Sequence, residues 1–459
     1  MGNAIPVKHD AIFRLDIQSV TATATKSYIN LGHLRSAVKS IEQGIGTTFQ
    51  QMLQLKPDVD KLPPNQAADL EQLSFQLYTG KAVNPRELAA KRKDLLDNIH
   101  KQPGLEYFLL PKPYNALCNA AQQGPVVILN SHASECDGII ILNPTSEPVH
   151  VSFPNVTLQQ LHSQQKMLKE LLGCCNGFTS KTVKECFEEI LTWLWSNVVD
   201  PVYQVLASCG IFSGRLWWLP TGLFTGLPFH ASPSADEFIP SYTATLESLM
   251  VAQAKKSSNK QKVGVVGVTH TDQGGRNYLK GVEEEVKKIC SMIPNHDLEC
   301  LEGEHATPDA VKFQLQNCSW VHLACHGTQD LVEPTKSRLL LYNGNLELET
   351  ILQMPLSNAQ FVFLAACQTA MGDTELMNES FHLGGGFIAA GFRSAVASMW
   401  SMNDQDGPLV AEKFYSHLFL DGQQPQTSDT AEALHLAVRE LKARGVPYER
   451  WIPFIHMGV

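Results

Sequence analysis

The sequence has no apolar run of membrane-spanning length, no cluster of basic residues and no Cys-x-x-Cys pair. A helix needs about 20 consecutive apolar residues to cross a bilayer, so we expect no membrane partner. The 36 Lys and Arg residues are outnumbered by 46 Asp and Glu residues, which gives a formal net charge of −10. Because nucleic-acid-binding surfaces need clustered positive charge, we expect no nucleic-acid partner.

The cysteines and short motifs exclude several kinds of site. The 11 cysteines are odd in number, and without Cys-x-x-Cys spacing they support neither a zinc ribbon nor a thioredoxin-like pair. The Gly-x-x-x-x-Gly-Lys-Ser/Thr phosphate loop is also absent. We therefore expect no metal and no cofactor.

The N-terminal residues and the cysteine surroundings bear on location. The first ten residues, MGNAIPVKHD, lack the apolar core of a signal peptide, and Pro6 stands where a myristoylation signal needs Ser or Thr. Most cysteines lie in apolar surroundings, as is typical of a reducing compartment. We expect a cytoplasmic protein, with the nucleus as the other compartment that fits.

A chain of 459 residues is too long for one ordinary core, so we expect two or three domains. Residues 1–115 have apolar side chains at helical spacing between prolines and predict a helical segment. Residues 116–261 begin with short β-rich runs and continue into two helices. Residues 262–459 alternate apolar strands with amphipathic helices, which is typical of an α/β domain with a parallel sheet.

Two apolar strands end in residues that can do chemistry. The run FVFLAACQTAMGD at 361–373 predicts a buried strand that ends at Cys367, and SWVHLACHG at 319–327 ends in His326 and Gly327. Since neighbouring parallel strands present their carboxyl ends at one edge, we expect His326 and Cys367 to meet there. A single buried Cys or His is more often a packing residue, and it is the ordered pair that favours catalysis.

A thiol beside an imidazole predicts nucleophilic catalysis. Cys367 would attack a carbonyl carbon as the thiolate, and His326 would protonate the leaving amine. The backbone amides of Gly327 and Cys367 are the expected oxyanion hole, because a residue without a side chain lets substrate approach closely.

Four motifs together resemble the CHAT family, the caspase-like domains that follow tetratricopeptide repeats (TPR) and are related to separase. They are VHLACHG, LAACQTAMGD, GGGFIAAGFRSAVASMW and the tail YERWIPFIHMGV. The resemblance implies a caspase-like, mostly parallel sheet flanked by helices and a cysteine endopeptidase acting on a protein or peptide. It is strong over the last half of the chain. Ala365 stands where the family commonly has serine.

Two aspartates follow the last predicted core strand. Asp404 and Asp406, in SMNDQDG, resemble a separase segment whose acidic pocket takes arginine, which implies cleavage after Arg. A carboxylate pairs well with a guanidinium in a partly dry pocket. The alternative is that one or both aspartates cap the next helix, since Asp406-Gly407-Pro408 is typical of a helix start.

The N-terminal part carries a weaker resemblance. The segment NLGHLRSAVKSIEQG is similar to part of a TPR, and a plain helical cap fits equally well. The resemblance implies an activating protein partner bound by this helical part. The alternatives to an endopeptidase are an inactive CHAT scaffold for protein interactions and a thiol acyltransferase on a related fold. The intact pair of His326 and Cys367 favours the enzyme.

Overall fold

The computed structural model describes residues 11–45, 62–78, 84–173, 182–232, 237–255, 262–270, 278–330, 333–368, 383–419 and 425–459. The chain separates into two compact units, Met1–Leu117 and Cys118–Val459. The segments predicted as 116–261 and 262–459 both lie in the second unit.

The first unit is helical, as predicted for the N-terminal part. Its described helices are α1 (Ala11–Asn30), α2 (Leu34–Gly44), α4 (Pro64–Tyr78), α5 (Pro85–Ile99) and α6 (Tyr114–Leu117). Helix α5 begins at Pro85, because the Asn84 side chain accepts a hydrogen bond from the Glu87 amide and Pro85 occupies the first turn. Helices α4 and α5 pack around Leu70, Leu96 and Ile99.

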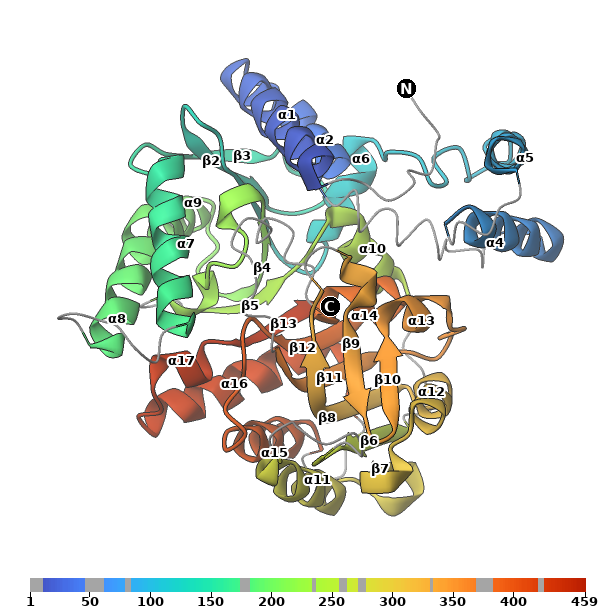
Figure 1. The fold of residues 1–459 in the computed structure, drawn as a ribbon. Helices are drawn as coiled ribbons and strands as arrows, with labels where there is room; N and C mark the ends of the chain where they lie inside the picture. Colours follow the sequence, from blue (N-terminus) through green and yellow to red (C-terminus); the bar gives the residue numbers. More distant parts are fainter. Residues whose placement is uncertain are drawn as a thin grey trace. The chain divides into compact units, whose positions relative to one another are not determined.

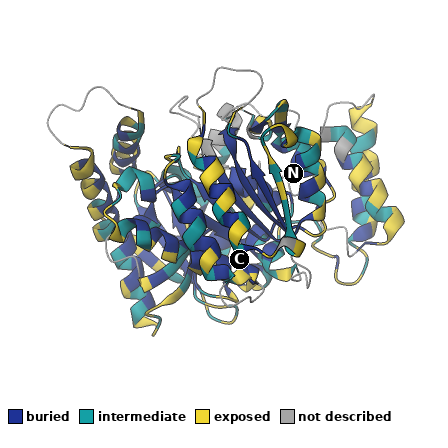
Figure 2. Ribbon diagram, turned by 90° about the horizontal axis from the view of Figure 1, so that it is seen from below, coloured by how far each residue is buried: buried dark blue, intermediate teal, exposed yellow. Residues whose placement is uncertain are grey.

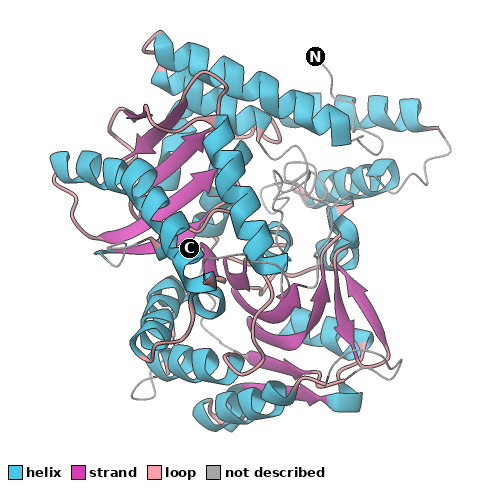
Figure 3. Ribbon diagram, turned by 60° about the vertical axis from the view of Figure 1, so that its left-hand side comes forward, coloured by secondary structure: helices cyan, strands magenta, loops and turns pink. Residues whose placement is uncertain are grey.

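The second unit is built on one mixed, mostly parallel sheet (Figures 1 and 3). Along the main path the strand order is β10-β9-β8-β11-β12-β13-β5-β4-β1-β2-β3, and β6 pairs with both β7 and β8. The strands are β1 (Val126–Asn130), β2 (Cys136–Ile141), β3 (Val149–Phe153), β4 (Gly214–Pro220), β5 (Phe238–Tyr242), β6 (Val263–Gly267), β7 (Leu298–Glu302), β8 (Trp320–Thr328), β9 (Arg338–Leu341), β10 (Gly344–Glu347), β11 (Phe361–Gln368), β12 (Ser394–Ser398) and β13 (Phe454–Gly458).

Helices cover both faces of this sheet. They are α7 (Leu158–Gly173), α8 (Val183–Leu194), α9 (Asp200–Ser208), α10 (Leu246–Ala254), α11 (Lys280–Met292), α12 (Pro308–Asn317), α13 (Leu348–Gln353), α14 (Leu383–Ala389), α15 (Gly407–Leu418), α16 (Thr430–Ala443) and α17 (Tyr448–Trp451). Helices α11, α15 and α16 form one layer, and α12 and α14 lie on the opposite face. Figure 2 shows the buried strands between helices whose outer sides are exposed.

Glycines in α14 let this helix lie close to the sheet. A Cβ on Gly384 would come within 2.8 Å of the Ala397 side chain, and one on Gly386 within 2.5 Å of Leu348. This close packing of α14 on the sheet outweighs the low helix propensity of glycine.

Strand β8 changes its neighbour along its length. Residues 320–324 pair in parallel with β6, and residues 326–328 pair antiparallel with β9. Strand β11 accompanies β8 on the other side from Trp320 to Gly327. His326 therefore lies inside the sheet, where β8 has left β6 and joined the β9–β10 hairpin.

Strand β13 lies inside the sheet and not at its edge. It runs antiparallel to β12 and pairs in parallel with β5 through Met457 and Tyr242. The sequence predicts a final strand or edge for 451–459, and the strand is present. Its internal position joins strands β8, β11 and β12 to the β-rich part of the chain.

Candidate active site

The register of two parallel strands brings the backbones of the predicted nucleophile and base side by side. Strands β8 and β11 pair from Trp320 opposite Phe361 to Gly327 opposite Gln368, and Cys367 lies opposite His326. Neighbouring strands are separated by about 4.8 Å, so the two backbones are as close as adjacent strands allow. The side chain of Cys367 and the following segment 369–382 lie outside the described residues.

His326 is held on both sides by the sheet. Its register partners are Cys367 in β11 and Leu340 in β9, and the residue is only 7% exposed. Gly327 continues the strand, opposite Gln368 and Leu339, because β8 extends to Thr328. The strand therefore runs two residues beyond His326, further than the sequence pattern indicates.

Asp404 lies in the loop after β12 and binds the start of another helix. Its Oδ2 atom accepts a hydrogen bond of 2.7 Å from the Gly281 amide, in the first turn of α11. A carboxylate at a helix N-terminus is stabilised by the unpaired amides and by the helix dipole. The capping expected of these aspartates therefore occurs at α11, and not at the helix that follows in sequence.

Asp406 is buried and already holds a guanidinium. Its two carboxylate oxygens accept hydrogen bonds of 2.8 and 2.6 Å from Nε and Nη2 of Arg450, and its side chain is 3% exposed. The residue occupies the N-cap position of α15, but its side chain makes no capping bond. Arg450 of the same chain is thus bound to a carboxylate that, from the sequence, we expect to bind an arginine of the substrate.

A buried polar network, missed in the sequence, lies four residues before His326 on the same strand. His322 Nε2 lies 3.0 Å from Glu285 Oε1, and His322 Nδ1 lies 3.2 Å from the Tyr415 hydroxyl. The neutral ring fits if Nε2 donates to the carboxylate and Nδ1 accepts from the phenol. Burial raises the pKa of Tyr415 well above its ordinary value, with the nearby Glu285 charge contributing. The sequence signal for this network was His322 itself, because a histidine inside an apolar strand is buried and needs hydrogen-bond partners there.

Two contacts join α11 and α15, one at the first turn of each helix. Asp404, just before α15, binds the first turn of α11, while Glu285 of α11 lies against Gly407 at the first turn of α15. A Cβ on Gly407 would be 2.6 Å from Glu285 Oε2. Within the described residues, no three His, Cys, Asp or Glu side chains gather as a metal site.

The described helices also include none that is long and apolar enough to cross a bilayer.

The sequence pattern of the CHAT domain matches residues 188–459, more than half of the chain. The chain belongs to the CHAT domain family. The matched part contains β8 and β11, with the pair of His326 and Cys367, whereas β1, β2 and β3 precede it. No curated protein is similar enough in sequence to count as a match.

Solved structures share the fold of this CHAT protein at low sequence identity. Two structures of the Saccharomyces cerevisiae separase–securin complex align with TM-scores of 0.52 and 0.51 and 10% identity, over 97% of this chain and 40% of the other. The CHAT chain thus spans less than half the length of that structure's chain. The pro- and mature domains of Porphyromonas gingivalis RgpB align less well, with a TM-score of 0.41 and 8% identity over 65% of this chain and 75% of that one. The fold is caspase-like, as the sequence motifs predict.

Proposed function

We propose that this CHAT protein is a cysteine endopeptidase of the caspase and separase type, with Cys367 as nucleophile and His326 as acid and base. The observation that carries the proposal is the register of β8 and β11, which makes these two residues direct neighbours inside the sheet. Membership of the CHAT family and the caspase-like fold support the same reaction class.

The proposed reaction has two steps. The Cys367 thiolate adds to the carbonyl carbon of the peptide bond, His326 gives a proton to the leaving amine, and the C–N bond breaks to leave a thioester. Water, deprotonated by His326, then attacks the thioester and releases the acid and the thiol. The backbone amides of Gly327 and Cys367 are our proposed donors to the oxyanion in both steps.

We propose that the enzyme cleaves after Arg, with Asp404 as the carboxylate that receives the guanidinium. Asp404 is half-buried in the loop that follows β12, the neighbour of β11. In the described structure the Asp406 carboxylate binds Arg450. The role we propose for Asp406 is therefore to hold in place the loop 399–406, which also carries Asp404. A carboxylate held in place binds a planar guanidinium more selectively than a mobile one.

We also propose that the helical unit Met1–Leu117 binds an activating protein partner and that the enzyme acts in the cytoplasm. The unit is compact by itself, with its own buried cluster around Leu70 and Leu96. None of the eight cysteines whose state the structure describes forms a disulfide, which suits a reducing compartment.

Labelling with an arginine acyloxymethyl ketone tests the proposal, because this probe alkylates an active thiol. We expect covalent labelling of the full chain that is lost in Cys367→Ala and His326→Ala and weakened in Asp404→Asn. The matched control is Cys209→Ala, which removes an exposed cysteine far in sequence from the site and should leave labelling unchanged.

Two outcomes would contradict the proposal. Labelling that persists in Cys367→Ala would assign the reactivity to another thiol. Absence of labelling and of cleavage in a library of Arg-containing peptides, with and without proteins captured by the helical unit, would favour the inactive scaffold.

A further inference from the structure

Two cysteines outside the proposed active site lie between α11 and the strand β7 (Figure 1). Cys290 is in the last turn of α11, and Cys300 is the middle residue of β7. Cys290 is half-buried, Cys300 is exposed, and both are free thiols in this structure. Small solutes can therefore reach the pair from outside.

The register of β6 and β7 directs Cys300 toward α11. Cys300 lies opposite Val265 of β6, two residues before Gly267. Alternate residues of a strand share a face, so Cys300 lies on the same face of the sheet as Gly267. A Cβ on Gly267 would come within 2.6 Å of the Val286 side chain, so α11 covers this face. Cys290 follows Val286 by four residues on the same side of the helix and therefore lies over Cys300.

The two thiols are in side-chain contact and differ in acidity. The hydrogen bond from Cys300 lowers the pKa of Cys290, although burial and the charge of Glu302 oppose this shift. The same bond raises the pKa of Cys300, and burial raises it further. Cys300 Sγ also lies 3.4 Å from Glu302 Oε1, which can accept its proton in a hydrogen bond. Cys290 is therefore the thiol that ionises first and reacts as the nucleophile.

A disulfide between these cysteines requires a small movement at the edge of the sheet. The S–S bond is about 2.05 Å long, so two thiols in hydrogen-bond contact must approach each other to form it. Among the described strands, β7 pairs with β6 alone, so it can shift without breaking any other pairing. The approach leaves the pairing of β8 with β11 unchanged.

We propose that Cys290 and Cys300 are a redox-sensitive pair that a peroxide converts to a disulfide. The Cys290 thiolate attacks one oxygen of the peroxide, the O–O bond breaks, and the leaving oxygen takes up a proton, so that Cys290 becomes a sulfenic acid. The Cys300 sulfur then attacks the Cys290 sulfur, and the Cys300 proton leaves with the hydroxyl group as water. The two sulfur atoms are oxidised, the peroxide is reduced, and a dithiol reverses the change.

The disulfide would connect the last turn of α11 to the edge strand. The first turn of the same helix binds Asp404 through the Gly281 amide. Oxidation would therefore fix the position of the helix to which the loop after β12 is attached. The proposal does not depend on the peptidase activity, because neither cysteine belongs to β8, β11 or that loop.

Peptide mapping of the full chain after treatment with hydrogen peroxide tests the pair directly. Free thiols are blocked with N-ethylmaleimide, and a glutamyl endopeptidase then cleaves after Glu299, which places the two cysteines in different peptides. We expect a linked pair of peptides that dithiothreitol separates and that is lost in Cys290→Ser and in Cys300→Ser. Cys209→Ser is the matched control, because it removes an exposed thiol at the end of α9 and should keep the linked peptides.

The order of the two steps has a separate readout. Dimedone, which traps sulfenic acids, should label position 290 in Cys300→Ser about tenfold more than position 300 in Cys290→Ser. Equal labelling would overturn the assignment of Cys290 as the nucleophile. The pair itself is overturned if the wild type forms no linked peptides under conditions that oxidise Cys209. The linked peptides of the wild type identify both residues, so this result does not depend on how the variants fold.

Discussion

Arg450 holds Asp406 through two parallel hydrogen bonds, across 44 residues of sequence. The pair fastens the loop after β12 to the short helix α17, and the Trp400 indole adds a bond of 2.8 Å to the Glu449 carbonyl. The loop that carries Asp404 is therefore fixed at both ends by the segment just before the last strand.

Removing Arg450 should destabilise the fold strongly. Arg450→Gln leaves the Asp406 carboxylate buried without its cation, and we expect a loss of about 3 kcal/mol in the free energy of unfolding. The measurement is urea denaturation followed by tryptophan fluorescence. Arg444→Gln, which breaks an exposed pair with Glu440, should cost less than about 0.5 kcal/mol. Similar losses in the two variants would show that the buried pair contributes little.

Gly281 should not accept a side chain. A Cβ at this position would meet the carbonyl oxygen of Asp404, so Gly281→Ala must displace the loop from α11. We expect a loss of about 1–3 kcal/mol, as is usual for overpacking, together with weaker labelling by the arginine probe. Gly344→Ala serves as the control, because its Cβ would approach only the Pro308 ring, at 3.2 Å. An unchanged melting temperature in Gly281→Ala would refute the close approach.

Stability should depend on the length and polarity of the side chain at position 285, which lies beside His322. Glu285→Ala leaves the His322 Nε2–H group without its acceptor, and we expect a loss of about 2–4 kcal/mol in unfolding free energy. Glu285→Gln keeps an acceptor oxygen and should lose less than half of that. Glu284→Ala, on the exposed side of the same helix turn, should change stability by less than about 0.5 kcal/mol. Equal effects at 284 and 285 would contradict the network.

Stability should fall as the solution becomes acidic. The pKa of His230 is about 4 in the folded chain against an ordinary 6.5, and burial lowers the pKa of His456 well below its usual range, with the Arg215 charge contributing. Above pH 6.5 both forms of the protein hold the rings neutral. Between pH 6.5 and 4 only the unfolded chain binds the protons, so folding loses free energy.

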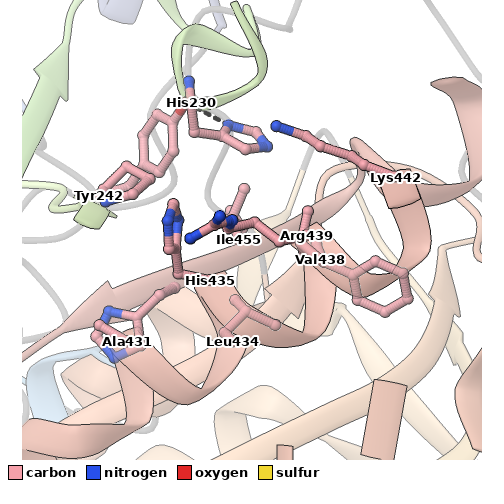
Figure 4. Close-up of a pocket in the computed structure, with 12 residues that line it drawn as sticks. His230, Tyr242, Ala431, Leu434, His435, Val438, Arg439, Lys442 and Ile455 are labelled. Atoms are coloured by element: carbon pink, nitrogen blue, oxygen red, sulfur yellow. Dashed lines mark hydrogen bonds between the residues drawn. The ribbon is translucent and has the colours of Figure 1, made fainter. Parts of the chain in front are cut away.

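His230, whose half-buried ring (Figure 4) contributes at most about 3 kcal/mol, supplies part of this effect, and the buried His456 adds to it in the same direction. Denaturation midpoints at pH 7.5 and 5.0 measure it. His230→Gln should weaken the dependence on pH and leave the part due to His456, whereas His305→Gln, at an exposed histidine, should not change it. A wild-type midpoint that does not move between the two pH values would rule out this origin.

The fold class followed from local patterns, because the central strands β6, β8, β11 and β12 are largely apolar runs and several helices have a start signal in their own sequence. Thr307 before Pro308, for example, caps the start of α12 through the Ala310 amide. Asp406 shows the limit of such reasoning. Its sequence context is that of a helix cap, yet its carboxylate binds an arginine 44 residues away.

The partners of the site residues could not be predicted from the sequence, because they come from distant parts of the chain. Asp404 and Gly281 are 123 residues apart, and Glu285 and His322 are 37 residues apart. Spacing along one sequence carries no signal for such pairs. The internal place of β13 was missed for the same reason, since an apolar strand reads alike at an edge and between two neighbours.

Strand β8 is paired over different lengths on the two sides of His326. On the side of Cys367 the ladder is continuous for eight residues, whereas on the side of Leu340 only three residues of β8 join the hairpin. Detaching β9 and β10 would break those three pairings and leave β6, β8 and β11 joined. The β9–β10 hairpin is thus weakly attached beside His326. We expect hydrogen exchange to show that it opens as a separate unit, before the core does.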